Sequence, residues 1–359
     1  MELRRSEFLL TLSAAALAPA YQPIDRGLVL SGGGAKGAYE AGVIEALAYG
    51  IPDGQPLRPY GGVTGTSIGC LNGWFVATGQ YSRMRSLWMN VATEQVFRLK
   101  PEFAKIDNPD AGVLNRVYEL FHLGFGVDNN VHGLCQTAPA LGWVEKYVDA
   151  SRPAVLPFAW AVTNLTQQTP EYFYRLPPGI SGSTRDAVLA NFKSALPPGT
   201  VVREATDDIL HRAIFASACL PVVFDPMELP APDGNGMNQY CDGGVAANTP
   251  LAFARVVAKN VDIVLLTPRY VPSSYANALE IAVGAYDTMQ RYMMYAAMRS
   301  TFLENGGTRG GRRIAFLRPR SILPVGTTTF SDQALLNAAY ELGREDGAHG
   351  FTPYTQGAL

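Results

Sequence analysis

Short apolar runs alternate with helical segments along most of the chain. Gly27 to Leu30 is apolar and runs into the glycine-rich residues 31–34, which predicts a buried strand entering a tight turn. Residues 37–49 then predict a helix that is apolar nearly all round, and Gly50 and Pro52 end it. The start of the chain therefore predicts a strand–turn–helix unit with both elements buried.

The same order recurs, because residues 61–63 lead through Ser67 into a helical segment that ends at Gly79. Three more apolar runs of strand length follow at residues 158–163, 261–267 and 314–317. Strands that alternate with helices are typical of the α/β class. They predict a three-layer α/β/α architecture with a central, mostly parallel sheet covered on both faces.

Two segments interrupt this rhythm and are interpreted as insertions, residues 95–150 and 170–212, both with Pro, Gly, Asn and aromatic residues. Two helices are expected nearer the C-terminus. An apolar stripe at helical spacing predicts a core-facing side for the first, formed by Ala282, Tyr286, Met289, Met293 and Ala297. Residues 331–345 predict a second amphipathic helix with Ser331 as its N-cap.

Composition narrows the class of protein. The 359 residues are 47% hydrophobic and 17% charged, with a net charge of −2, so there is material for a large core but no basic face for nucleic acid. No run reaches the roughly 18 apolar residues of a spanning helix. Four cysteines fit neither a zinc pattern nor a disulfide framework, so we expect reduced, buried thiols and no metal.

The first 20 residues have features of an export signal. Arg4 and Arg5 precede an apolar run from Phe8 to Ala18, and a small-x-small sequence then ends at Ala20. The alternative is an N-terminal helix packed on the domain in a cytoplasmic protein. We favour the signal, and hence a periplasmic or secreted protein.

Residues Gly65 to Gly69 read G-T-S-I-G, placed between a predicted strand and a predicted helix. A sharp strand-to-helix turn exposes a serine hydroxyl, and the flanking glycines, Gly65 and Gly69, permit the close packing that this turn requires. The helix N-terminus also favours negative charge developing at Ser67. Ser67 is therefore the candidate nucleophile.

A second motif, Gly32-Gly33-Gly34-Ala35-Lys36-Gly37, supplies backbone N–H groups that can converge on one point. Aimed at the serine, they would form an oxyanion hole. The same residues fit the G-x-G-x-x-G dinucleotide fingerprint with Asp53 downstream, but Asp53 lies in a turn, so an oxidoreductase is the weaker alternative. Gly37 after Lys36 excludes a Walker A loop.

A third motif, Asp242-Gly243-Gly244, is by itself an ordinary turn sequence. It is of interest only because the other two motifs are present. A serine nucleophile needs a base, and histidine is the usual one. None of the four histidines lies in a glycine-flanked loop or beside a predicted strand end. An acid that acts directly on the serine is therefore the better hypothesis than a histidine triad.

The order of these motifs resembles the patatin-like phospholipase family. Residues 28–39 are similar to its opening, residues 65–72 to its nucleophile elbow, and residues 240–250 to its acidic motif, and residues 216–224 resemble the segment that leads to that motif. The likeness runs from about residue 26 to about residue 267. It implies one catalytic domain, 26–267, holding both insertions, with residues 268–359 as a helix–strand–helix extension packed on it.

The resemblance also implies the chemistry. Ser67 would be the nucleophile, Asp242 the base and the amides of residues 32–37 the oxyanion hole, with Lys36 fixing that loop and Gly243 and Gly244 supporting the turn. An acyl lipid would be the substrate, and the protein would meet it at a membrane or lipid aggregate. The two insertions would shape the lipid-facing entrance of the protein. No cofactor is expected. A non-catalytic lipid-binding member of the family is the remaining alternative.

Overall fold

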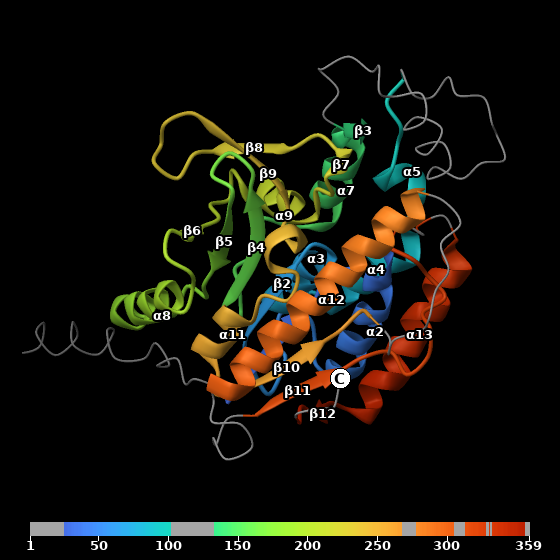
Figure 1. The fold of residues 1–359 in the computed structure, drawn as a ribbon. Coiled ribbons are helices and arrows are strands. Elements are labelled where there is room, and N and C mark those ends of the chain that lie inside the picture. Colours follow the sequence, from blue (N-terminus) through green and yellow to red (C-terminus); the bar gives the residue numbers. More distant parts are fainter. Residues whose placement is uncertain are drawn as a thin grey trace, which may run out of the picture.

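The computed structural model describes residues 25–101, 133–267, 278–304, 313–327, 330 and 332–355, which contain a central ten-stranded sheet (Figure 1). Eight strands follow the order β12-β11-β10-β1-β2-β4-β5-β6, and β9 pairs with both β4 and β8. The strands are β1 (Arg26–Leu30), β2 (Tyr60–Thr66), β4 (Phe158–Asn164), β5 (Thr169–Arg175), β6 (Val201–Glu204), β8 (Met227–Pro230), β9 (Met237–Asp242), β10 (Asn260–Val264), β11 (Ile314–Leu317) and β12 (Thr352–Pro353). A small parallel pair joins β3 (Gly133–Cys135) to β7 (Val222–Phe224).

The middle of the sheet is parallel, from β11 through β10, β1 and β2 to β4, and antiparallel pairs occur toward the edges. Helices cover both faces: η1 (Gly34–Lys36), α2 (Gly37–Leu47), α3 (Ile68–Thr78), α4 (Tyr81–Asn90), α5 (Thr93–Val96), α7 (Thr137–Tyr147), α8 (Gly182–Ser194), α9 (Leu210–Ala218), α10 (Gly244–Ala247), α11 (Leu251–Val257), α12 (Ala278–Glu304) and α13 (Gln333–His349). The predicted three-layer α/β/α architecture is confirmed.

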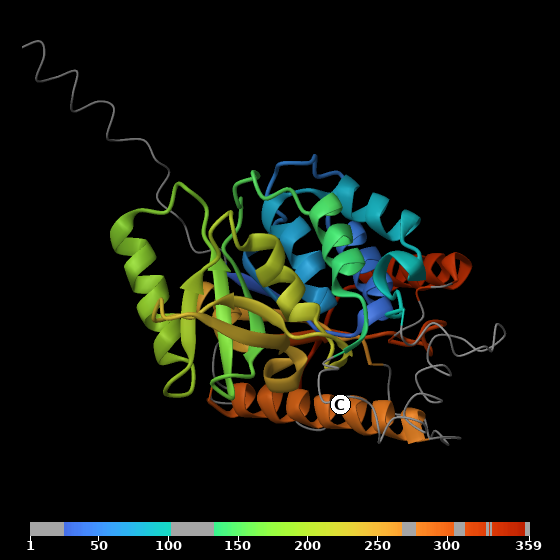
Figure 2. The same ribbon diagram turned by 90° about the horizontal axis from the view of Figure 1, so that it is seen from above.

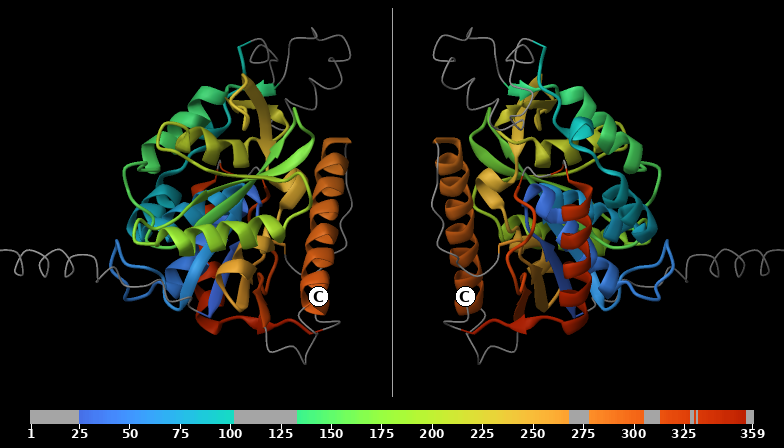
Figure 3. Two further views of the ribbon diagram at one scale, coloured as in Figure 1. Left: turned by 90° about the vertical axis from the view of Figure 1, so that its left-hand side faces the viewer. Right: turned by 90° about the vertical axis from the view of Figure 1, so that its right-hand side faces the viewer.

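Side-chain alternation along the strands explains the two covered faces. Leu28 and Leu30 of β1 belong to the large core under α2, α3, α4, α7, α9 and α13, whereas Val29 faces the core under α11 and α12. In β4, Trp160 faces the first core and Ala161 packs beside α8 and α11. Figures 2 and 3 show α12 along one side of the molecule, opposite α4 and α7.

Two predictions about the C-terminal helices need correction. The buried positions of α12 include Gln290, Met294 and Met298, while Met289 is 43% exposed, so the predicted core-facing stripe is displaced by one residue. The reason is a polar contact, described below, that holds Gln290 inward. Helix α13 begins after Asp332, whose carboxylate accepts from the amides two and three residues on, so Asp332 and not Ser331 is the N-cap.

Residues 170–212 form most of β5, then α8 and β6, and they extend the sheet at one edge. The predicted signal in residues 1–20 and most of the insertion 95–150 lie outside the described residues. All four cysteines are buried and free, as predicted. No helix in the described ranges is long and apolar enough to cross a membrane.

Candidate functional site

Ser67 occupies the sharp turn between β2 and α3. Its φ of 55° and ψ of −126° are unusual for a side-chain-bearing residue and are typical of backbone strain at functional sites. A methyl group on Gly65 would lie 2.2 Å from the Gly69 carbonyl oxygen, and one on Gly69 would lie 2.5 Å from the Leu30 carbonyl oxygen. Only glycine at both positions lets the turn close this tightly.

The register of β4 brings Asp242 beside Ser67. Strand β2 pairs with β4 as far as Thr66 opposite Ala161, one residue before Ser67. Strand β9 then takes the place of β2 along β4, and its last residue, Asp242, lies opposite Val162. The ends of β2 and β9 therefore meet at consecutive residues of β4, although 175 positions separate Ser67 from Asp242 in the sequence.

Ser217, at the end of α9, joins these two elements. Its hydroxyl accepts from the Ser67 amide at 2.9 Å and donates to the Ala161 carbonyl at 2.7 Å. Its carbonyl accepts from the Gly243 amide at 3.1 Å, and the neighbouring Asp242 amide donates to the Cys219 carbonyl at 2.8 Å. Sequence reasoning missed Ser217, and its only signal was a place inside the family-like segment 216–224.

The Asp242 carboxyl lies 1% exposed at the end of β9. Burial raises its pKa to about 7, partly offset by Ser67 and by the Gly244 amide, which donates to Oδ1 at 2.6 Å. The Ser67 hydroxyl is close enough to favour the ionised carboxyl, although Oδ2 has no partner in hydrogen-bonding geometry within the described residues. Catalytic hydrogen bonds often tighten only when substrate binds.

The glycine-rich loop after β1 lies directly against Ser67. A methyl group on Gly32 would lie 3.1 Å from Ser67 Cβ. The Gly32 amide donates to the Asn248 carbonyl at 3.2 Å, and the amides of Lys36 and Gly37 donate to carbonyls of the loop itself. In the described part of the chain, the Gly33 and Gly34 amides donate to no backbone carbonyl.

Gly34 has a φ of 58°, and a side chain there would collide with the Thr327 carbonyl. Glycine is therefore required at this point of the loop. Lys36 Nζ lies 3.3 Å from Asp287 Oδ2 of α12, in a half-buried ion pair that anchors the loop. Gln290, one turn farther along α12, donates to the Gly244 carbonyl at 3.4 Å.

A buried polar network lies beneath the loop and the elbow. Asn72 of α3 donates to Glu40 of α2 at 2.8 Å and to the Gly37 carbonyl at 3.0 Å, and it accepts from Trp88 at 2.9 Å. Burial raises the pKa of Glu40 to about 8. Glu40 is therefore mostly protonated at pH 7, and the network ties the helix after the glycine loop to the helix after Ser67.

An apolar cavity opens beside Ser67. Its walls come from segments distant in sequence: Gly34, Ser67, Ile68, Leu71, Val96, Phe97, Ala140, Trp143, Val144, Ile214, Phe215, Ala218, Leu220, Phe224 and Phe330. Phe97 stacks on Phe224 with ring centroids 5.6 Å apart and packs against Phe330 at 5.5 Å. The cavity therefore combines one hydroxyl with a wall of packed aromatic and aliphatic side chains.

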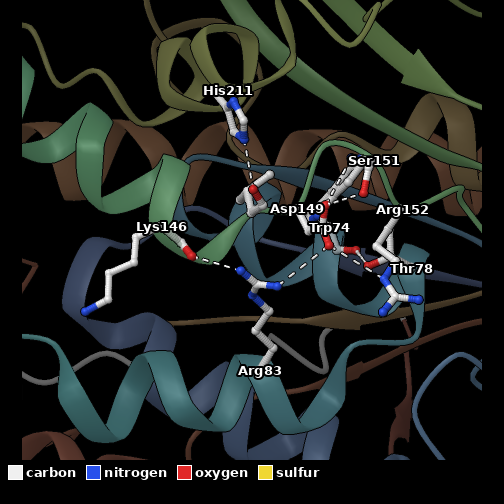
Figure 4. A network of polar contacts seen from close by, with 9 residues as sticks. Trp74, Thr78, Arg83, Lys146, Asp149, Ser151, Arg152 and His211 are labelled. Carbon is white, nitrogen blue, oxygen red and sulfur yellow. Dashed lines mark hydrogen bonds and ion pairs between the residues drawn. The ribbon is translucent and has the colours of Figure 1, made fainter.

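Neither described histidine belongs to this site. Figure 4 shows His211 in a polar network near Arg83 and Asp149, where its Nε2 lies 2.8 Å from the Val148 carbonyl oxygen. His349 contacts the Glu345 carbonyl in the last turn of α13. His122 and His132 lie outside the described residues.

Asp53, which follows the glycine-rich loop in the sequence, has a structural partner. The Asp53 carboxylate accepts from the amide and hydroxyl of Ser82, so it bonds to the first turn of α4. Across residues 25–101, 133–267, 278–304 and the later described ranges, no group of three or more His, Cys, Asp or Glu side chains is placed to hold a metal ion.

Comparison with known proteins identifies the family. The model of patatin-like phospholipases matches residues 28–255, more than half of the chain and the part that carries all three motifs. Among solved structures, VipD from Legionella pneumophila is similar over 93% of this chain and 68% of its own, with 15% identity and a TM-score of 0.39. No curated protein matches the sequence. The chain belongs to the patatin-like phospholipase family, and it is a lipid hydrolase.

Proposed function

We propose that this lipid hydrolase cleaves carboxylic ester bonds of phospholipids or related acyl lipids with a Ser67–Asp242 dyad. The observation that supports the proposal is the register of β4, along which pairing with β2 ends and pairing with β9 begins, so that Asp242 lies next to Ser67, and Ser67 lines an apolar cavity. A buried carboxyl with a pKa of about 7 is suited to accept the serine proton near neutrality.

The reaction follows from the geometry. Ser67 Oγ attacks the ester carbonyl carbon while its proton passes to Asp242, which then protonates the leaving alcohol. The Gly33 and Gly34 amides, together with the N-terminus of α3, stabilise the oxyanion, and each such donor is worth roughly 2.7–4 kcal/mol. The Gly32, Lys36 and Gly37 amides donate within the protein and hold the shape of the loop.

The cavity beside Ser67 is proposed to bind the acyl chain. Ala140 of α7 is 1% exposed and lines it, so Ala140→Phe is expected to lower kcat/KM for p-nitrophenyl decanoate about tenfold or more while p-nitrophenyl acetate is cleaved nearly as before. Ala138→Phe, on the exposed side of the same helix, is the matched control. Equal losses with both esters in Ala140→Phe would remove the cavity from the proposal.

A peripheral contact with lipid aggregates is proposed beside the cavity, near Leu220 and Val222. Leu220 lines the cavity, and Val222, two residues on, is 51% exposed with a φ of 69° that a β-branched residue seldom adopts. An apolar side chain held outward at this point suits entry of a lipid from a surface. Export to the periplasm or medium is proposed from residues 1–20 alone.

Labelling with a fluorophosphonate probe tests the dyad, since such probes react with an activated serine that faces an oxyanion hole. We expect one adduct, located by peptide mass spectrometry on Ser67, and a large drop in labelling rate in Asp242→Asn. Folded wild-type protein that takes up no probe at Ser67 would favour the alternative, a lipid-binding member without catalysis.

A further inference from the structure

Helix α12 lies beyond the residues that match the family model, yet it contacts both halves of the site. Asp287 pairs with Lys36 of the glycine-rich loop at 3.3 Å, and Gln290 donates to the Gly244 carbonyl at 3.4 Å. Tyr286 precedes Gln290 by four residues and so lies on the same face of the helix. The inward face of α12 is polar where it crosses the Asp242–Gly244 turn.

Three polar side-chain atoms converge over the Cα of Gly244. A methyl group there would lie 2.6 Å from Gln290 Nε2, 2.8 Å from Asp242 Oδ1 and 2.9 Å from Asn248 Oδ1. Asn248 Oδ1 also faces Gly32, since a methyl group on that glycine would lie only 2.3 Å away. Because Gly32 packs on Ser67, the Asn248 amide lies between the elements that carry the nucleophile and the base.

Several of these atoms are buried and lack a hydrogen-bond partner among the residues that the structure describes. Asp242 Oδ2, Asn248 Oδ1 and Tyr286 Oη have no partner in hydrogen-bonding geometry within the described residues, although the Ser67 hydroxyl lies near Asp242 and Gln290 lies near the Tyr286 hydroxyl. Buried polar atoms in native proteins are normally satisfied, and a small cluster that mixes donors with acceptors is satisfied by water. Burial raises the pKa of Tyr286 well above its usual range, so its hydroxyl remains a donor.

We propose that Asn248, Tyr286 and Gln290 hold the water molecule that hydrolyses the acyl-enzyme. This rests on the proposed function, because an acyl group on Ser67 is the species attacked. The water oxygen bonds to the acyl carbonyl carbon and its proton passes to Asp242. The bond between that carbon and Ser67 Oγ then breaks, Ser67 regains the proton from Asp242, and the free acid leaves.

These residues would act in the second half of the reaction only, which gives a specific test with p-nitrophenyl butyrate in stopped flow. In Gln290→Ala, Tyr286→Phe and Asn248→Ala we expect a pre-steady-state burst close to one equivalent and a steady-state rate lowered about tenfold. Intact-protein mass spectrometry should show the butyryl adduct accumulating. Tyr292→Phe removes the same hydroxyl from an exposed position of α12 and should match the wild type.

The burst amplitude counts folded, competent sites, so a poorly folded variant cannot imitate the expected result. A proportional fall of burst rate and steady-state rate would overturn the proposal, because the residues would then support the site as a whole. An unchanged steady-state rate in all three variants would also overturn it. Failure of the wild type to label at Ser67 is a separate result, which would reject the dyad itself.

Discussion

Asp242→Asn is expected to lower kcat/KM for ester hydrolysis about 10⁴-fold, the scale seen when the acid of a catalytic serine site is removed. Asparagine retains an oxygen that can accept from the Gly244 amide, so the turn after β9 can persist. Its NH₂ group cannot take a proton from Ser67. Because the native carboxyl is buried and its pKa is raised, the neutral amide should leave the melting temperature unchanged or slightly higher.

Ser67→Ala should reduce activity to a similar extent, and the double variant should be no worse than either single one, since the two groups act as a unit. Asp233→Asn is a matched control, because Asp233-Gly234 is another Asp-Gly pair, exposed in the turn between β8 and β9. Hydrolysis rates with a soluble ester check the loss of activity, and thermal unfolding checks that the variants remain folded. Turnover near the wild-type level in Asp242→Asn would contradict the assignment of the base.

The local parts of the fold were predictable because each depends on neighbouring residues. The apolar run before Ser31 predicts β1. The glycines on either side of Ser67 predict the turn between β2 and α3, because a turn this tight requires glycine at those positions. Parallel strands buried on both faces produce continuous apolar runs. The order of elements therefore indicated the three-layer class without any knowledge of pairing.

The meeting of Ser67 with Asp242 is a different kind of fact. It depends on β9 pairing antiparallel to β4 just beyond the end of β2, and neither strand carries a local sign of that register. The motif Asp242-Gly243-Gly244 reads as a common turn. From the sequence, only the resemblance to a family connects this motif with Ser67. The structure shows why they meet, because β9 pairs with β4 at the residue after β2 ends.

Helix α12 shows where a hydrophobic pattern misleads. The predicted stripe through Met289 is apolar, yet Gln290 faces inward, where it donates a hydrogen bond to the Gly244 carbonyl. Ser217 escaped prediction for a related reason, since its importance lies in which backbone groups it bonds. At functional sites, the hydrogen bonding of buried polar groups can outweigh the pattern of hydrophobic and polar residues.

Activity and stability are expected to move in opposite directions between about pH 5 and pH 8. Asp242 must be ionised to accept a proton, and its pKa is about 7, so kcat/KM should fall close to tenfold for each pH unit below 7 and about 100-fold by pH 5. The sign for stability is reversed. The folded-state pKa lies above the unfolded value of 3.8, so the native protein binds more protons across this range and loses stability as pH rises.

Glu40 adds to the stability effect but not to the activity profile. Its pKa rises from 4.5 to about 8 on folding, so it too weakens the native state as it ionises, and stability falls progressively as the pH rises from about 5 to about 8. The midpoint of urea unfolding and kcat/KM, both measured from pH 5 to pH 8.5, distinguish the effect of Glu40 ionisation from that of Asp242 ionisation. Glu40→Gln should flatten part of the stability curve and keep the activity midpoint near 7. A pH-independent kcat/KM would show that Asp242 is not the group whose ionisation limits catalysis.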